Sequence, residues 1–232
     1  MSLRLFALSL LTSLPVLAIA EPPLERPLAS KGKLLFEDDF QRDDLGKWKE
    51  VIPRFNVADG MLTGGQDKPS HGSVGRIYLP MKDVVMSFRF RLNGSPRFNV
   101  VFDDKAHKGS HAGHILRVAV AMKEIRLGDD KEGLMRNDIF KMRRDPKQSD
   151  AATKLLVGRS SAAKVQLEQK RWYKMNIELL GDQMRVSLDG KPIGHLKSSG
   201  LAHPTKQSVH FTISGNETNF DDVQIWSAKP TK

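Results

Sequence analysis

One segment, Trp172–Gly190 (WYKMNIELLGDQMRVSLDG), constrains the fold of this chain more than any other. Apolar side chains occupy every second position in each half: Met175, Ile177 and Leu179, then Met184, Val186 and Leu188. A period of two predicts strands with one buried face. Gly and Asp between and after the halves favour tight turns. A lone hairpin is marginally stable in water, so this one needs more strands and a second layer over its apolar face.

The same alternation returns along most of the chain. It predicts further strands at 55–64, which holds two strands around an Asp-Gly turn, and at 73–79, 84–92, 97–103, 115–122, 124–128, 209–213 and 219–226. Many short strands separated by turn signals are typical of two packed antiparallel sheets. The sequence therefore predicts an all-β fold, a two-sheet antiparallel jelly-roll sandwich.

The N-terminus has the layout of a secretory signal peptide. Arg4 precedes an apolar run over 5–17, and Ala18 and Ala20 supply the small residues that a signal peptidase requires before its cleavage site. We expect cleavage after Ala20, removal of residues 1–20 and export to the periplasm or the medium. The apolar run is too short and too interrupted to span a bilayer, and no later segment is apolar enough, so no membrane span is expected. The Pro-rich residues 21–33 are expected to form a tether.

Composition limits the chemistry and the partners. The chain contains no Cys, which excludes a disulfide framework, thiolate catalysis and Cys-ligated metal. Loss of the signal peptide would leave 36 basic residues against 27 acidic ones. An exported basic protein suits anionic polysaccharide or cell envelope better than nucleic acid. General solubility is the alternative that composition leaves open.

One segment, 129–163, departs from the strand pattern. It is rich in Lys and Arg, and apolar residues from Leu134 to Met142 indicate a short helix. We expect it to leave the sandwich as a long excursion. Long loops within a compact domain are either functional or disordered, so a binding role and a lid without a specific role both remain open.

Five stretches together resemble a known family: LLFEDDFQRDDLGKWK, FNVADGMLTGG, YLPMKDVVMSFRFRL, WYKMNIELLGDQMRVSLDG and FDDVQIW. Their order is similar to that in concanavalin A-like (laminin-G) β-sandwiches of exported bacterial proteins, most closely the 3-keto-disaccharide hydrolase-like domain. The resemblance implies one domain over 34–227, followed by a tail at 228–232. It also implies a carbohydrate partner. The sequence lacks the Glu-x-Asp-x-x-Glu stretch of laminarinase-like glycosidases, whose retaining mechanism needs two carboxyls about 5–5.5 Å apart, so a retaining glucanase is not expected.

Acid–base and metal chemistry have two candidate locations. Asp103 and His114 flank a loop rich in His and Gly and are candidates for catalysis near neutral pH. An ordinary polar loop is the alternative there. Acidic residues near the first and last strands could converge on a structural Ca²⁺, which prefers several oxygen ligands: Asp38, Asp39, Asp221 and Asp222. Water-facing turns are the alternative for these four, and no cofactor is expected to be required.

A ligand face is expected opposite the core-facing side chains of two successive strands. The alternation turns Arg89 and Arg91 away from the core, and likewise Arg97, Asn99 and Asp103, with Arg117 joining them if its register agrees. Guanidinium groups suit carboxylates and sulfates because they offer two parallel N–H donors. A solvated sheet face is the alternative.

Three functions remain open from the sequence. The favoured one is glycan binding with a preference for acidic saccharides. The others are hydrolysis of 3-keto-disaccharides or related glycosides, implied by the resemblance, and a non-catalytic interaction with the cell envelope. Whether the protein is an enzyme is undecided at this point.

Overall fold

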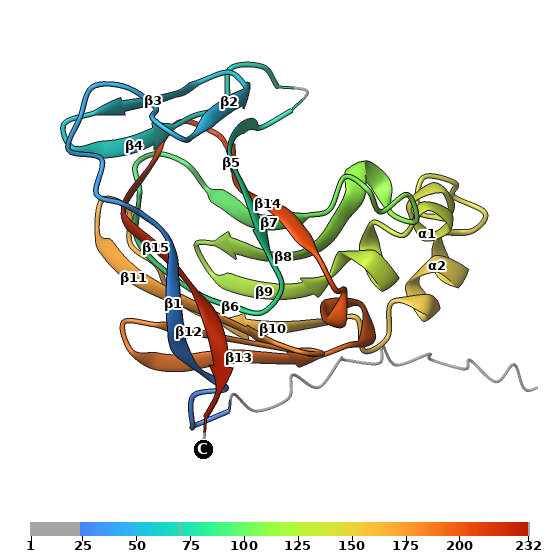
Figure 1. The fold of residues 1–232 in the computed structure, drawn as a ribbon. Coiled ribbons are helices and arrows are strands. Elements are labelled where there is room, and N and C mark those ends of the chain that lie inside the picture. The colour runs from blue at the N-terminus through green and yellow to red at the C-terminus, as the bar shows by residue number, and fades with distance from the viewer. Residues whose placement is uncertain (1–23, 70, 232) are drawn as a thin grey trace, which may run out of the picture.

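The computed structural model describes residues 24–69 and 71–231, and these form two antiparallel sheets packed face to face (Figure 1). The predicted signal peptide, residues 1–20, lies outside the described residues. One sheet has eight strands in the order β13-β12-β11-β6-β15-β4-β3, with β1 beside β15. Its strands are β1 (Ala29–Asp38), β3 (Phe55–Ala58), β4 (Met61–Gly64), β6 (Val84–Leu92), β11 (Trp172–Leu180), β12 (Gln183–Leu188), β13 (Lys191–Lys197) and β15 (Thr218–Pro230).

The second sheet has seven strands in the order β10-β9-β8-β7-β14-β5-β2. These are β2 (Lys49–Ile52), β5 (Ser73–Met81), β7 (Arg97–Asp103), β8 (His114–Ala121), β9 (Glu124–Asp129), β10 (Ser160–Lys164) and β14 (Lys206–Ser214). The prediction of an all-β, two-sheet antiparallel sandwich is confirmed, and the Trp172–Gly190 hairpin is β11 and β12.

Aromatic side chains from both sheets meet in the core. Phe88 of β6 and Phe220 of β15 come from the eight-stranded sheet, and Phe98 and Phe211 come from the other; all four are fully buried. The rings of Phe211 and Phe220 stack at 3.9 Å, and those of Phe98 and Phe220 meet edge to face at 5.1 Å. Such rings contribute most of the apolar area between the layers, so they fix which face of each strand points inward.

The strands β6 and β7 follow one another in the chain but lie in different sheets. β6 pairs with β11 and β15, whereas β7 pairs with β8 and β14. Side chains that point away from the core therefore leave the sandwich on opposite sides, depending on whether they start from β6 or β7. The expectation that these two strands share one ligand face is wrong.

The N-terminal segment is part of the sandwich from Leu24 onward. β1 begins at Ala29, so the expected tether at 21–33 is wrong for residues 29–33. The preceding residues lie against the eight-stranded sheet, where Arg185 Nε donates to the Leu24 carbonyl at 2.8 Å. The buried carboxylate of Glu178 accepts from the Ala29 N–H at 3.0 Å. This segment is thus held by hydrogen bonds to buried charged groups.

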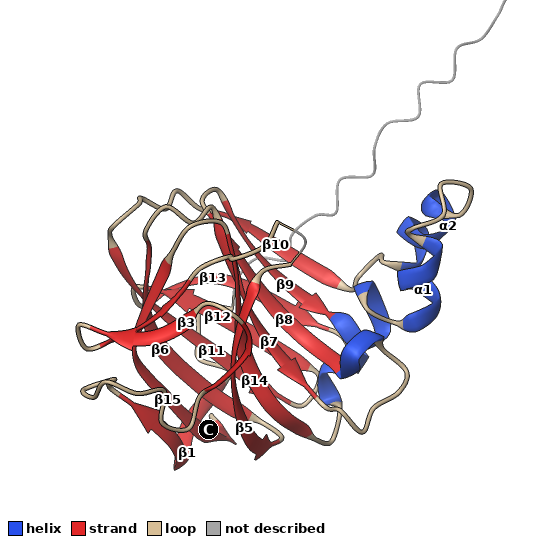
Figure 2. Cartoon of the chain, turned by 90° about the horizontal axis from the view of Figure 1, so that it is seen from above, coloured by secondary structure: helices blue, strands red, loops and turns tan. Residues whose placement is uncertain are grey.

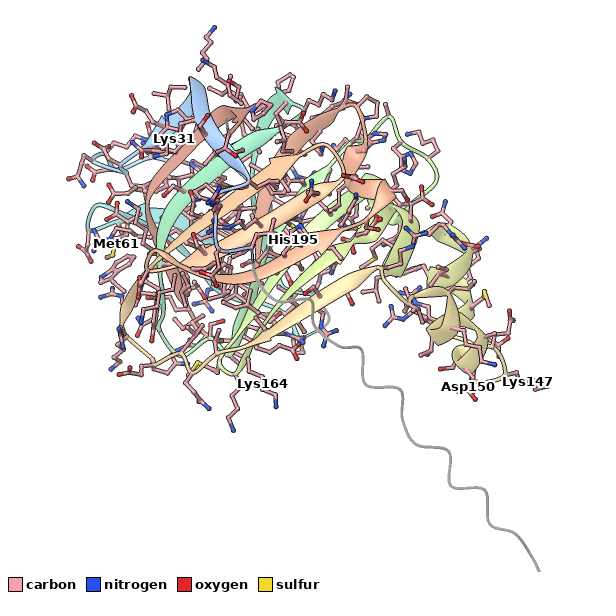
Figure 3. The ribbon with its side chains drawn as sticks, turned by 90° about the horizontal axis from the view of Figure 1, so that it is seen from below. Lys31, Met61, Lys147, Asp150, Lys164 and His195 are labelled. Atoms are coloured by element: carbon pink, nitrogen blue, oxygen red, sulfur yellow. The ribbon has the colours of Figure 1, made fainter. Side chains whose placement is uncertain are left out.

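The excursion at 129–163 carries a π-helical turn (Asp130–Leu134) and the helices α1 (Asn137–Met142) and α2 (Ser149–Leu155). Both helices stand beside one end of the sandwich (Figure 2). Lys147 and Asp150 lie at the tip of the excursion, whereas Lys164 lies back on the sandwich (Figure 3). The excursion is shorter than expected, because β10 pairs with β9 from Ser160 onward. No helix among the described residues combines the length and hydropathy that a membrane crossing requires.

Candidate functional site

Three titratable side chains meet on the outward face of the seven-stranded sheet. Asp103 ends β7, His114 begins β8 beside it, and His210 lies on β14 at the other side of β7. His114 Nδ1 is 2.6 Å from Asp103 Oδ1, and His210 Nδ1 is 2.9 Å from Asp103 Oδ2. Arg76 of β5 reaches the same Oδ2 at 2.9 Å. We call these four residues the Asp103 cluster.

The alternation of the strands places this cluster outside the core. Phe102 of β7 and Val209 of β14 are buried in the core, and successive side chains point to opposite faces, so Asp103 and His210 point outward. A register shift between Phe102 and Asp103 brings His114 directly opposite Asp103. A bulge of this kind re-aims a side chain at a sheet end, which here joins a carboxylate to an imidazole.

Burial and hydrogen bonding set the charges of the cluster. Burial raises the pKa of the Asp103 carboxyl, but the hydrogen bonds from His114 and His210 outweigh it and hold that pKa well below its ordinary value. Burial lowers the pKa of His210, which its hydrogen bond to Asp103 only partly offsets. At neutral pH the carboxylate is therefore ionised and His210 is neutral, and Arg76 balances the charge of Asp103.

His114 is the accessible member of the cluster. Its side chain is 16% exposed, whereas Asp103 is fully buried. Asp103 occupies Nδ1, and within residues 24–69 and 71–231 Nε2 has no hydrogen-bond partner. A carboxylate that fixes the Nδ1–H of a histidine leaves Nε2 as an oriented proton acceptor. The arrangement can remove a proton from a molecule bound on this face.

A second ion pair lies beside His114. Arg117 of β8 donates from Nε to Asp130 Oδ2 at 2.7 Å, and the Asp130 side chain is 1% exposed. Burial raises the pKa of Asp130, and the charge of Arg117 opposes that increase. On the other side of the cluster, Tyr78 of β5 is 54% exposed, with Lys105 Nζ 5.4 Å from its ring. A mostly polar face is thus bordered by one exposed aromatic ring.

The excursion is attached to the loop that carries the site. The His111 ring stacks on Phe140 of α1 at 4.2 Å, and the Asn137 N–H donates to the Gly109 carbonyl at 3.0 Å. Arg144 lies over the other side of this stack, 4.1 Å from the Phe140 ring. The excursion therefore forms a wall next to His114, which is 6.2 Å from His111 between ring centres.

The structure divides the expected ligand face. Arg97, Asn99, Asp103 and Arg117 all lie on the outward face of the seven-stranded sheet, so the register of Arg117 agrees with the prediction. Arg89 and Arg91 lie on the outward face of the other sheet, each about 5 Å from the Trp172 ring. Those two residues cannot contact a ligand that is bound at Asp103.

The structure provides no calcium geometry at the predicted carboxylates. Asp38, Asp39 and Asp222 do border one cavity of about 510 Å³, as the pairing of β1 with β15 requires. However, Asp38 is bound in bidentate fashion by Arg42, and Asp221 and Asp222 face Arg89. Among the described residues, these four carboxylates do not form a group that could surround one ion.

The donor atoms that do converge are those of Asp103, His114 and His210, which lie within 4.8 Å of one another. Two imidazoles and a carboxylate are a donor set that transition metals accept. Arg76 already places a positive charge 2.9 Å from the same carboxylate, and both Nδ1 atoms already bind Asp103. A metal would have to displace these contacts, so the geometry fits proton transfer better.

Comparison of the sequence with protein families identifies the chain. Residues 33–226 match the family described as the 3-keto-alpha-glucoside-1,2-lyase-like domain. The chain belongs to this family. The match spans nearly all of the described residues and agrees with the resemblance seen in the sequence. No curated protein sequence matches the chain.

Solved structures show that this lyase-like domain shares its fold with a protein of unknown function, a carbohydrate-binding module and a laminarinase. A protein of unknown function with a galectin-like fold from Bacillus subtilis has a TM-score of 0.59 at 12% identity, and the match covers 88% of this chain and 100% of that one. The carbohydrate-binding module CBM66 from Bacillus subtilis has a TM-score of 0.52 at 12% identity (78% and 96%). A laminarinase from Flavobacterium sp. UMI-01 has a TM-score of 0.57 at 10% identity (84% and 100%). These similarities concern the fold.

Sequence reasoning found half of the Asp103 cluster. Asp103 and His114 were predicted because they flank one loop, but His210 and Arg76 are far away in the chain. Alternation does contain a weak signal for both. Phe211 and Ile77 point into the core, so His210 and Arg76 must point outward. What the sequence does not give is the pairing of β5, β14 and β7 that brings them together.

Proposed function

We propose that this domain binds a 3-keto-glycoside on the outward face of the seven-stranded sheet and that His114 removes the proton at C2 of the sugar. One observation carries the proposal: the partly exposed His114 imidazole is held at 2.6 Å by a buried, ionised Asp103. Family membership supports the substrate class. The carbohydrate-related names of the structural neighbours support a saccharide ligand.

The chemistry follows from the substrate. A ketone at C3 acidifies the C2–H bond, so a neutral imidazole can act as the base near neutral pH. His114 Nε2 takes the C2 proton, the C2–H electron pair forms the enolate and then the C1–C2 double bond, and the C1–O bond breaks. The departing oxygen accepts a proton from solvent. Hydrolysis, the alternative, would instead replace the C1 substituent by water and leave C2 unchanged.

Replacing His114 by asparagine is expected to lower kcat on a 3-keto-α-glucoside by about 10²–10⁴-fold. The asparagine amide can still donate to Asp103, so the thermal midpoint should change little while the base is lost. The readout is the unsaturated product, followed by NMR. His71→Asn is the matched control, because His71 lies in an exposed turn at the start of β5, away from the cluster. Unchanged turnover by H114N, or a product that retains hydrogen at C2, would contradict the proposal.

We further infer a preference for acidic saccharides. Arg97 is exposed on the same sheet face, six residues from Asp103 along β7, and Lys105 is exposed at the rim of the site. A depression of about 270 Å³ beside the site is bordered by Lys105, His107 and Lys108. The excursion adds Lys141, Arg143 and Arg144 on α1 or directly after it. Cations gathered around a site attract anionic ligands, and salt weakens this attraction.

This preference predicts a difference between the two faces of the sandwich. Binding of a uronate polymer should weaken at least several-fold in the double variant R97A/K105A and fall further with added salt. The matched control is R89A/R91A, which removes two positive charges from the opposite sheet and should leave affinity unchanged. Affinity can be measured by calorimetry at two ionic strengths. Equal losses in both double variants would contradict the assignment.

Export, the remaining proposal, is tested by N-terminal sequencing of the secreted chain, expected to begin at Glu21.

A further inference from the structure

Arg117 has two unused donor groups beside the proposed base. Arg117 and His114 lie three residues apart on β8, and the register shift at Ile115 places them opposite Val101 and Asp103, two successive outward residues of β7. Outward neighbours on one strand are separated by about 7 Å. The stem of Arg117 lies beside Gly128 of β9, where a Cβ atom would be 3.5 Å from Arg117 Cγ. The guanidinium therefore lies on the same side of the sheet as the His114 imidazole.

A buried carboxylate, that of Asp130, fixes the orientation of this guanidinium. Asp130 accepts from Arg117 Nε at 2.7 Å and is itself buried, so it holds the plane of the guanidinium without reaching solvent. The Arg117 side chain keeps 18% of its surface exposed. In the part of the chain that the structure describes, neither Nη1 nor Nη2 of Arg117 has a hydrogen-bond partner. The terminal N–H groups are oriented and free to bind a ligand.

Arg76, the other arginine of the site, is used differently. It donates to Asp103 and is 9% exposed, so it balances a charge inside the protein. Arg117 is the more accessible of the two. Arginine remains protonated throughout the physiological range and cannot compete with His114 for the proton. These properties suit an electrophile that must stay positive while a negative charge forms next to it.

We propose that Arg117, oriented by Asp130, binds the C3 ketone oxygen and stabilises the enolate that forms when the C2 proton leaves. This inference rests on the proposed function. Removal of that proton turns the C2–H electron pair into the C2–C3 double bond of the enolate and moves the C3=O π pair onto the ketone oxygen, so negative charge develops on that oxygen, two bonds from C2. Donors fixed at the position where such charge develops stabilise the transition state more than the ground state. Arg117 is then a catalytic residue, and Asp130 is a positioning residue.

The test separates enolate formation from loss of the leaving group. The probe is 1,5-anhydro-3-keto-glucitol, which carries the C3 ketone but no substituent at C1. In D₂O, the wild-type protein should exchange the C2 hydrogen, as followed by ¹H NMR above the uncatalysed background. In Arg117→Gln the exchange rate should fall by about 10²–10³-fold, with a dissociation constant for the probe within a few-fold of the wild-type value. Arg117→Lys should retain an intermediate rate, since it keeps the charge but loses the fork.

The controls distinguish the two proposals. Arg126→Gln removes an exposed arginine of the neighbouring strand β9 and should exchange like the wild type. If the wild-type protein exchanges, H114N does not, and R117Q does so at the wild-type rate, the role of Arg117 is refuted and the proposed function stands. If the wild-type protein neither exchanges nor eliminates, the proposed function itself fails. If R117Q does not fold, the exchange rate of R117K is used instead. An R117K rate equal to that of the wild type would refute the role proposed for the Arg117 guanidinium.

Discussion

Asp103→Asn is expected to lower the free energy of unfolding by about 3–5 kcal/mol at pH 7, because it leaves the Arg76 guanidinium buried without its counter-charge. For a domain of this size, the thermal midpoint should fall by roughly 6–20 °C. The variant should also lose His114 orientation, with a decrease in kcat of about 10²–10⁴-fold. Calorimetry and turnover of a 3-keto-glycoside measure the two effects.

The effect on stability has a defined pH dependence. The pKa of Asp103 is lower in the folded protein than the ordinary value of about 3.9, so the ionised carboxylate stabilises the fold above that pH. This contribution is lost as the pH falls from about 4 toward the folded pKa. The difference between wild type and D103N should therefore be largest near pH 7 and shrink in acid. Asp138→Asn, which breaks an exposed pair with Arg136, is the control and should cost no more than about 1 kcal/mol at any pH. A difference that grows in acid would contradict the charge assignment.

Glu178→Gln is expected to be as destabilising, by about 3–5 kcal/mol, because it likewise leaves a buried arginine, Arg185, without its counter-charge. Glu178 and Arg185 are 2% and 5% exposed and lie 2.5 Å apart on the eight-stranded sheet. Glu178 also accepts from the N–H groups of Leu28 and Ala29. Its loss should release residues 24–28, so limited proteolysis should cut there before the domain unfolds. The control is Glu168→Gln, which breaks an exposed ion pair with Arg171. The melting curve of this variant should match that of the wild type. Protection of residues 24–28 in E178Q would show that the ion pair does not hold them.

Alternation along single strands determined most of what the sequence could predict about the fold. Met175, Ile177 and Phe88 are buried as expected, because inward and outward positions follow from a period of two. The sheet to which a strand belongs is a non-local property. Only a short turn separates β6 from β7, as in a hairpin, yet Asn93 and Ser95 in that turn donate to the Glu217 carbonyl instead, and the chain crosses from one sheet to the other. Arg89 therefore points outward, as predicted, but on the opposite side of the sandwich from Arg97.

The same limit applied to the site. Asp103 and His114 could be predicted as a pair because only a loop separates them, whereas His210 and Arg76 join them through strand pairings between distant segments. The calcium prediction had the same limit, because the sequence does not show which groups hydrogen-bond to a carboxylate. Asp38 looked like a potential calcium ligand, but the Arg42 guanidinium and the Trp48 indole N–H occupy its oxygens. Donors four and ten residues away, the Arg42 guanidinium and the Trp48 indole, thus determine the contacts of Asp38 more than the acidic residues of the last strand do.

The helical excursion starts and ends between two strands that are already neighbours. Gly128 of β9 lies opposite Ser160 of β10, and the Asp129 N–H donates to the Arg159 carbonyl at 2.9 Å, so the two ends of the insert are stapled together. Because the two ends of the insert are already joined by strand pairing, a longer insert adds only a small further entropic cost of loop closure. The wall beside His114 can thus be exchanged between relatives without changing strand order. Replacement of residues 131–158 would therefore change the surface beside His114 while Asp103 and its partners keep their positions in the sheet.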